Sequence, residues 1–134
     1  MIRKIYNIFK EEPIFKNGYL RFLYQDLKKK NDLGHFLFEN DTYLDYHIYK
    51  KKPIVRLNRI ISKNKNQGNG TRIINQFLSK FKNKKVILKV NKTNLKAIRL
   101  YTKLGFIFEK DLSKEYAQYC IEPKIELKKE LNKL

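Results

Sequence analysis

The stretch from Asn94 to Phe106, which reads NLKAIRLYTKLGF, decides how the rest of this sequence is interpreted. Its apolar residues recur three and four positions apart, which predicts an amphipathic helix over Thr93–Leu104. Gly105 follows as a C-terminal stop. Asn94 and Tyr101 are seven positions apart, or two helical turns, so both side chains can face the same ligand.

A second informative stretch, KNQGNGTR at Lys65–Arg72, lies between a predicted strand at Ile54–Ile61 and a predicted helix at Thr71–Phe81. The first N–H groups of a helix have no partner within it, and the helix dipole favours an anion there. Glycines let the backbone approach that anion closely, and Lys65 and Arg72 add positive charge. Taken alone, the loop has two interpretations: a phosphate-binding turn, or a tight turn that needs glycine for its backbone angles.

Together, the two stretches resemble the GNAT superfamily of acetyl-CoA-dependent N-acetyltransferases, from Ile54 to about Lys110. The matching motif residues are Lys65, Gly68 and Gly70 in the loop, then Asn94, Ala97, Tyr101, Gly105 and Phe106; Lys65 stands where the family usually has Gln or Arg. The resemblance implies an α/β (α+β) fold with a mixed, mostly antiparallel central sheet, flanking helices and splayed central strands. We expect a single domain over residues 1–134, with residues 1–53 as its smaller first half.

The resemblance also implies a binding site for acetyl-CoA as co-substrate. The loop would cradle the CoA pyrophosphate, and the later helix would contact the pantetheine arm and hold a tyrosine near the thiol. The strand before the loop would offer backbone groups to the pantetheine, and no metal is expected. The residues implied to bind the cofactor are Ile60, Ile61, Lys65, Gln67, Gly68, Asn69, Gly70, Thr71, Arg72, Asn94, Ala97 and Tyr101.

The implied reaction is direct attack of a neutral amine on the acetyl thioester. Tyr101 is the predicted catalytic residue, since a phenol is a positioned donor for the leaving thiolate. The alternative is that Tyr101 is only a core residue of the apolar stripe. Asn94 likewise has two possible roles, a hydrogen bond to the CoA arm or a cap on its helix.

The sequence does not identify a general base that would take the proton of the acceptor amine. Many family members place a glutamate on the strand that leads into the loop, but this strand reads IVRLNRII, with Arg56 near the expected place. An arginine cannot accept a proton. The remaining candidates lie in and around a predicted hairpin: Glu39, Asp45 and His47. A chain without a base needs an acceptor amine of low pKa, such as a peptide or protein N-terminus or the aminoacyl group of a tRNA.

The net charge is +18, from 31 Lys and Arg against 13 Asp and Glu. From Arg56 to Lys103 there are fourteen basic residues and no acidic residue. Such a surface attracts polyanions, so RNA is one candidate partner, and compositional bias unrelated to function is the other interpretation. A catalytically silent CoA-binding module or a basic RNA-binding protein is the alternative to an enzyme.

Other features of the sequence limit the class of protein. The one cysteine, Cys120, excludes an internal disulfide and is expected to be a small buried residue. No apolar run approaches the length of a membrane span, and Met1–Lys10 lacks the apolar stretch of a signal peptide, so we expect a cytoplasmic protein without a membrane partner. A homodimer through the sheet edge or the C-terminal segment is also considered.

Weaker patterns complete the predicted order of elements. They are a strand or short helix at Ile2–Phe9, a helix at Ile14–Lys30 that ends at Asn31–Gly34, a hairpin of His35–Phe38 and Thr42–Tyr49 around Glu39–Asp41, strands at Val86–Val90, Phe106–Phe108 and Tyr116–Ile121, and a terminal helix at Pro123–Leu134.

Overall fold

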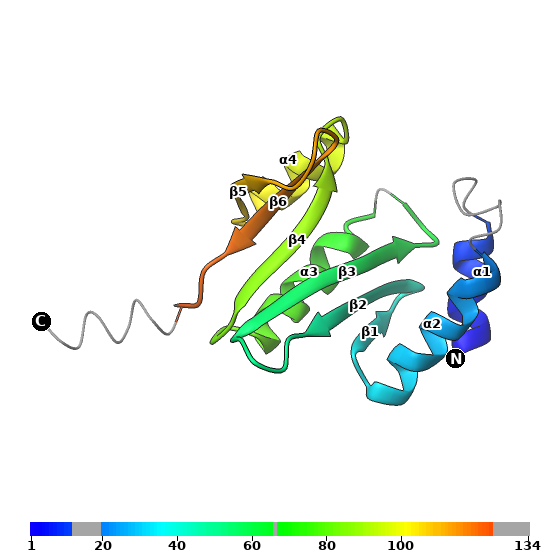
Figure 1. The fold of residues 1–134 in the computed structure, drawn as a ribbon. Coiled ribbons are helices and arrows are strands. Elements are labelled where there is room, and N and C mark those ends of the chain that lie inside the picture. Colours follow the sequence, from blue (N-terminus) through cyan, green and yellow to red (C-terminus); the bar gives the residue numbers. More distant parts are fainter. Residues whose placement is uncertain (12–19, 66, 125–134) are drawn as a thin grey trace, which may run out of the picture.

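The computed structural model of this chain describes residues 1–11, 20–65 and 67–124. Six strands and four helices follow one another along this part of the chain (Figure 1). In chain order they are α1 (Ile2–Lys10), α2 (Leu20–Leu33), β1 (Phe36–Glu39), β2 (Thr42–Ile48), β3 (Ile54–Ser62), α3 (Asn69–Lys80), β4 (Lys85–Asn91), α4 (Leu95–Lys103), β5 (Ile107–Asp111) and β6 (Tyr116–Ile121).

The strands form one sheet in the order β1-β2-β3-β4-β6-β5. Only β3 and β4 are parallel; the other neighbouring strands are antiparallel, so the predicted mixed, mostly antiparallel sheet is confirmed. The parallel pairing joins Ile54–Leu57 to Lys85–Leu88 and then stops, although both strands continue. The two central strands therefore separate toward the start of α3, as Figure 1 shows.

An extra residue in β3 marks the place where the strands separate. On β2, Asp45 pairs with Arg59 and Tyr46 pairs with Leu57, which leaves Asn58 without a partner on β2. Such a bulge reverses the side-chain alternation beyond it. Leu57 packs into the core beneath α3, and Ile60, rather than Arg59, returns to that same face.

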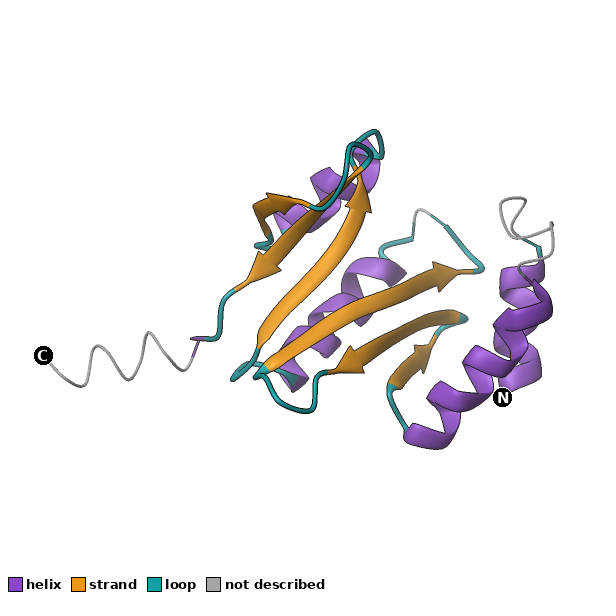
Figure 2. Cartoon of the chain, viewed as in Figure 1, coloured by secondary structure: helices purple, strands orange, loops and turns teal. Residues whose placement is uncertain are grey.

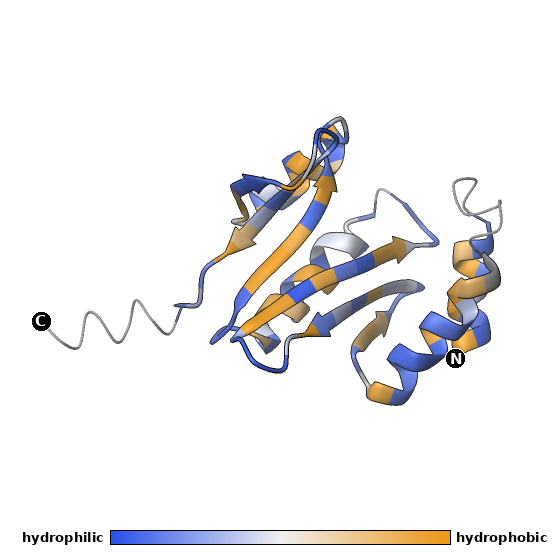
Figure 3. Ribbon diagram, viewed as in Figure 1, coloured by the Kyte–Doolittle hydropathy of each residue, from blue (hydrophilic) through white to orange (hydrophobic). Residues whose placement is uncertain are grey.

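The two faces of the sheet are covered differently. Helices α3 and α4 lie behind the sheet in Figure 2, and the main core lies between them and the strands, around Leu44, Val55, Ile74 and Phe77. Helices α1 and α2 pack on the opposite face at the β1 end only, through a second cluster that includes Ile5, Leu23, Tyr43 and Ile61. Hydrophobic and hydrophilic bands alternate along β3, as expected for a strand with one face in the core (Figure 3).

The hairpin prediction is confirmed at its turn. Asn40 and Asp41 both have positive φ angles, 51° and 53°, which are the backbone angles of a two-residue hairpin loop. The sequence left Ile2–Phe9 open between strand and helix, and this segment is helical. Gly105, with φ 106°, ends the α4 segment as predicted.

The helix predicted at Ile14–Lys30 extends beyond its predicted C-terminal end. Its described part, α2, continues through Asn31 and Asp32 to Leu33, while residues 14–19 lie outside the described part. Gly34 provides the physical reason, because its φ of 70° lets its own N–H and that of His35 bond back to the last turn, to the carbonyls of Asn31 and Lys30. Of the helix predicted at Pro123–Leu134, all but the first two residues lie outside the described residues.

Candidate functional site

A groove of about 600 Å³ lies on the α3 side of the sheet, between the start of α3 and helix α4. It forms where β3 and β4 have separated, so the last five residues of β3, from Asn58 to Ser62, have no partner on β4. Sequence-predicted residues that line it are Ile60, Lys65, Gly68, Asn69, Gly70, Thr71, Asn94, Ala97 and Tyr101, and they are joined by Ser62, Asn64, Lys96 and Leu100.

Four of these lining residues were missed in the sequence. Ser62 and Asn64 continue the strand into the loop, and Lys96 and Leu100 lie on α4 beside the motif positions. The α4 pair could have been found from helical spacing alone, because Lys96 and Leu100 are one helical turn apart, as are Ala97 and Tyr101.

Three predicted site residues do not line the groove. The side chain of Ile61 packs into the α1–α2 cluster on the other face, because the bulge at Asn58 turns Ile60 toward α3 instead. Gln67 and Arg72 are exposed beside the groove. Arg72 folds back over the loop, donating at 2.9 Å to the Gln67 carbonyl and also to the Asn69 side chain.

The loop glycines have different physical roles. Gly68 caps α3 with φ 75°, in the left-handed region, and a Cβ there would lie 3.3 Å from the Arg72 guanidinium. A Cβ on Gly70 would meet only Ile60, at an ordinary contact distance of 3.8 Å. The backbone of the fold therefore requires glycine at Gly68, whereas at Gly70 the missing side chain leaves space in the groove.

The start of α3 has the properties of an anion site. The Gly68 carbonyl accepts from the Arg72 N–H at 3.1 Å, so the helix begins at once after the glycine. Its first turn contains no acidic residue, and its N-cap is Gly68, which has no side chain to accept hydrogen bonds from the first N–H groups. The free N–H groups and the helix dipole therefore suit a phosphate group at the groove mouth, as a CoA pyrophosphate requires.

Asn94 acts as a helix cap in this structure. Its side-chain oxygen accepts a hydrogen bond from the Ala97 N–H at 3.2 Å. Of the two roles that the sequence left open, the structure therefore shows the cap, while the exposed side chain also borders the groove.

Tyr101 lies between the core and the groove. Its ring packs edge-on against Phe106, with centroids 5.7 Å apart, and it also lines the groove. Burial raises the pKa of the Tyr101 phenol, so the group stays protonated at neutral pH. A protonated phenol at this place has the chemistry of a hydrogen-bond donor to a leaving thiolate.

The three candidate bases lie in different surroundings. Asp45 is fully buried on the α1–α2 side, where it accepts from Tyr43 at 2.7 Å and pairs with Arg59 at 2.8 Å, so its role is structural. Glu39 is exposed and accepts a hydrogen bond from the side chain of Gln76, which lies on α3. His47 is exposed beside a hollow on the face opposite α3; burial, and then the charges of Lys30 and Arg56, lower its pKa.

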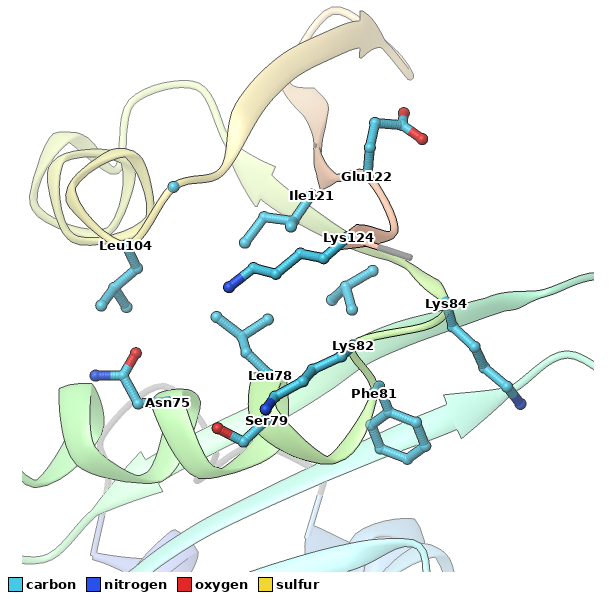
Figure 4. A pocket seen from close by; sticks show the side chains of 12 residues that line it. Asn75, Leu78, Ser79, Phe81, Lys82, Lys84, Leu104, Ile121, Glu122 and Lys124 are labelled. Carbon is cyan, nitrogen blue, oxygen red and sulfur yellow. The ribbon is translucent and has the colours of Figure 1, made fainter. Parts of the chain in front are cut away.

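Another hollow, of about 460 Å³, lies at the far end of α3 (Figure 4). Leu78, Leu104 and Ile121 point into it, and Lys82 and Lys124 extend over it. No sequence motif predicted this hollow, and it contains no residue of the proposed groove.

The predicted burial of Cys120 is confirmed, with 2% of the residue exposed. Its thiol lies beside Glu109 and Glu122, and burial, then Glu109, raises its pKa to about 12. The ammonium group of Lys85 pairs with both carboxylates and balances their charge.

The profile of the acetyltransferase (GNAT) family matches residues 2–106 of this chain. The chain therefore belongs to this family, as the motif resemblance predicted, and it is an acyltransferase with acetyl-CoA as co-substrate. A search of curated protein sequences gives no significant match.

Solved structures with the same fold include a chimera of the Vibrio cholerae spermidine N-acetyltransferase and its human counterpart, at 20% identity and TM-score 0.72, covering 95% of this chain and 93% of that chain. The PaiA N-acetyltransferase of Thermoplasma acidophilum, solved with coenzyme A, has 15% identity and TM-score 0.67 (90% and 89% covered). The ribosomal-protein-S18-alanine N-acetyltransferase of Escherichia coli has 16% identity and TM-score 0.62 (89% and 84% covered). All three are named as N-acetyltransferases, and the likeness shows the fold of this chain.

Within the described part of the chain, none of the helices has the length and apolar character needed to cross a membrane.

Proposed function

We propose that this acetyltransferase acts on an amine of low pKa, namely the α-amine of a peptide, a protein or an aminoacyl-tRNA. One observation carries the proposal: among the described residues, no carboxylate without an ion-pair partner lies beside the place where β3 and β4 separate, on the face opposite α3, because Asp26 there pairs with Arg59. Arg56 occupies β3 there, and the described residues that line the hollow next to it include no Asp or Glu. Asp45 is withdrawn into a buried pair with Arg59.

The pKa of the acceptor then decides how much of it can react. At pH 7 a lysine side chain is neutral in about one molecule in two thousand, whereas an α-amine is neutral in roughly a tenth to a sixth of molecules. Esterification of the carboxyl group lowers the α-amine pKa further. An enzyme without a base therefore favours α-amines by roughly two to four hundredfold at this pH.

In the proposed reaction, the neutral nitrogen forms a bond to the acetyl carbon and the carbon–sulfur bond breaks. The amine loses one proton to solvent, and the sulfur of CoA gains one. Tyr101 is proposed to donate a hydrogen bond to that sulfur, since its phenol borders the groove and keeps its proton. The start of α3, at Gly68 and Gly70, is proposed to bind the pyrophosphate.

A comparison of acceptors tests this proposal. Two peptides of one sequence are used, one with a free N-terminus and a blocked lysine, the other with a blocked N-terminus and a free lysine. We expect acetylation of the N-terminus to exceed that of the lysine by roughly two to four hundredfold at pH 7 and by only about 25-fold at pH 9, because the lysine gains neutral form. Equal rates on both peptides, or a ratio that ignores pH, would contradict the proposal.

A homodimer through the sheet edge is also proposed. β5 is an edge strand, and Ile107 and Phe108 on it are 61% and 54% exposed. Exposed apolar residues on a strand edge favour pairing with another chain. Analytical ultracentrifugation of the wild type and of Phe108→Lys tests this, and a monomeric wild type would rule it out.

A further inference from the structure

The sheet face opposite α3 has a basic hollow of about 500 Å³ beside β3, β4 and β6. Helices α1 and α2 cover only the β1 end of this face, so the hollow lies open (Figure 1). Its inner wall includes Leu57 and Leu88, the last pair joined before the two strands separate. The hollow thus lies across the sheet from the groove that contains Tyr101.

The charged residues that line this face are mostly basic. Among the described residues, Arg56 and Lys89 are the charged ones that line the hollow, and none of its lining residues is a carboxylate. A neighbouring hollow of about 540 Å³, on the other side of β3, shares Arg56 and Asn58 with the first one. It is lined by five Lys or Arg residues and one carboxylate, Asp26, which is itself paired with Arg59 at 3.1 Å.

The two arginines of β3, Arg59 and Arg56, differ in whether a carboxylate of the fold pairs with them. Arg59 is neutralised within the fold, because it pairs with both Asp45 and Asp26. Arg56 is half-buried, and within the described residues its side chain makes no hydrogen bond or ion pair. A guanidinium presents a planar fork of N–H donors, which can bind two oxygens of a phosphate or carboxylate ligand at once.

Lys89 is a second cation of this hollow that has no ion pair among the described residues. It lies two residues from Ile87, the partner of Arg56 on β4, and so extends from the same face of the sheet. Its ammonium group lies 4.3 Å from the ring centre of Tyr116, and none of the described carboxylates forms an ion pair with it.

Two histidines lie close to the same positive charges. His35 and His47 line the neighbouring hollow, and burial lowers the pKa of each. The charge of Lys30 lowers both pKa values further, and Arg56 contributes at His47. The histidines are therefore neutral at pH 7, and the net charge of this face comes from lysine and arginine.

We propose that the acceptor carries a phosphate group close to its reactive amine, and that Arg56 and Lys89 bind this phosphate in the hollow opposite α3. The proposal rests on the proposed acetyl transfer to a low-pKa amine and names the acceptor more closely. The phosphate belongs either to a small phosphorylated amine or to the backbone of an aminoacylated RNA. Because Arg56 and Lys89 repel positive charge, we do not expect a polycation to be a good acceptor.

The test uses acceptors that differ by one phosphate. Serine methyl ester and phosphoserine methyl ester present the same type of α-amine, and seryl-tRNA presents that amine beside RNA phosphates. With the full chain and acetyl-CoA, we expect kcat/KM for phosphoserine methyl ester, for seryl-tRNA, or for both, to exceed that for serine methyl ester. If phosphoserine methyl ester and seryl-tRNA are both preferred over serine methyl ester, the site binds a single phosphate close to the amine. If only seryl-tRNA is preferred, the site binds the RNA backbone.

Substitutions then locate the phosphate site. Arg56→Gln and Lys89→Gln should each lower kcat/KM for the preferred phosphate acceptor by about tenfold to a hundredfold, mainly through KM, and leave serine methyl ester unchanged. Lys82→Gln removes one positive charge at the far end of α3. It should leave kcat/KM unchanged both for the phosphate acceptor and for serine methyl ester. Circular dichroism melting of each variant checks that the fold is retained.

Two results would overturn the proposal. Equal kcat/KM for all three acceptors, or an equal loss on all three in Arg56→Gln, would show that no phosphate is bound there, while acetyl transfer itself would stand. If no acceptor is acetylated, the proposed function fails, and calorimetry of phosphoserine methyl ester with the CoA-bound chain decides the anion site separately. Binding that Arg56→Gln abolishes supports the site, and no binding to the wild type refutes it.

Discussion

The two faces of the sheet, compared where β3 and β4 separate, are built in different ways. On the α3 side, two local motifs form the groove: a glycine loop at the start of one helix, and the spacing of Asn94 and Tyr101 on another. On the opposite side, single residues from separate strands, Arg56 and Lys89, form a basic hollow without any motif. The comparison shows that the part of the site proposed for the cofactor is local in sequence, whereas the part proposed for the acceptor is assembled by strand pairing.

The largest expected effect tests the groove side of this comparison. Tyr101→Phe should lower kcat by about a hundredfold to ten-thousandfold, the range for loss of a proton donor, and leave the dissociation constant of acetyl-CoA within about twofold. The control is Tyr24→Phe, on the exposed side of α2, which should leave both values unchanged. Steady-state kinetics and calorimetry measure them. An unchanged kcat in Tyr101→Phe would mean that the phenol is only a core residue.

The next prediction separates the two arginines of β3. Asp45→Ala should destabilise the fold by about 3–5 kcal/mol, because it leaves Arg59 and the Tyr43 hydroxyl without their buried partner. Arg56→Ala should change stability by less than about 0.5 kcal/mol, since its side chain has no described partner. Urea unfolding measures both. A comparable loss in Arg56→Ala would assign this arginine to the fold rather than to a ligand.

A smaller effect is expected at the glycine that begins α3. Gly68→Ala should cost roughly 1–2 kcal/mol of stability, because alanine is strained at φ 75°. It should also weaken acetyl-CoA binding severalfold, because a Cβ displaces the Arg72 guanidinium beside the loop. Gly34→Ala is the matched control: φ is 70° there, nothing lies within 4 Å of a Cβ, and the groove is distant. Equal acetyl-CoA affinity in both variants would remove the loop from the binding site.

The smallest effect concerns a carboxylate at the edge of the basic face. Hydrogen bonds from Cys120 and then Lys85 lower the pKa of Glu109 to about 2. Its stabilising contribution is therefore complete above pH 4.5 and is lost as the pH falls toward 2, the usual sign for a lowered carboxyl pKa. Glu109→Gln should destabilise the fold by less than about 1 kcal/mol at pH 6, and by much less at pH 2, where the carboxyl group is about half protonated. Thermal unfolding at the two pH values measures this, and a difference that does not vary with pH would contradict it.

Much of the fold was predictable because its signals are local. The turn at Asn40 and Asp41, the stop at Gly105 and the helices on either side of β4 follow from backbone preference and spacing within a few residues. The end of α2 was placed too early, since Asn31 and Asp32 resemble a turn in sequence while Gly34 decides where the helix stops.

The sequence by itself determined the family, the class of fold and most of the residues that line the groove, because neighbours along one helix or loop fix their own geometry. Tertiary structure alone decided that Asn58 bulges and turns Ile60, not Ile61, toward α3. It also decided that Asp45 pairs with Arg59, while Arg56 has no ion pair among the described residues. These outcomes depend on which strands pair and in what register, and register is set by contacts between residues far apart in the chain.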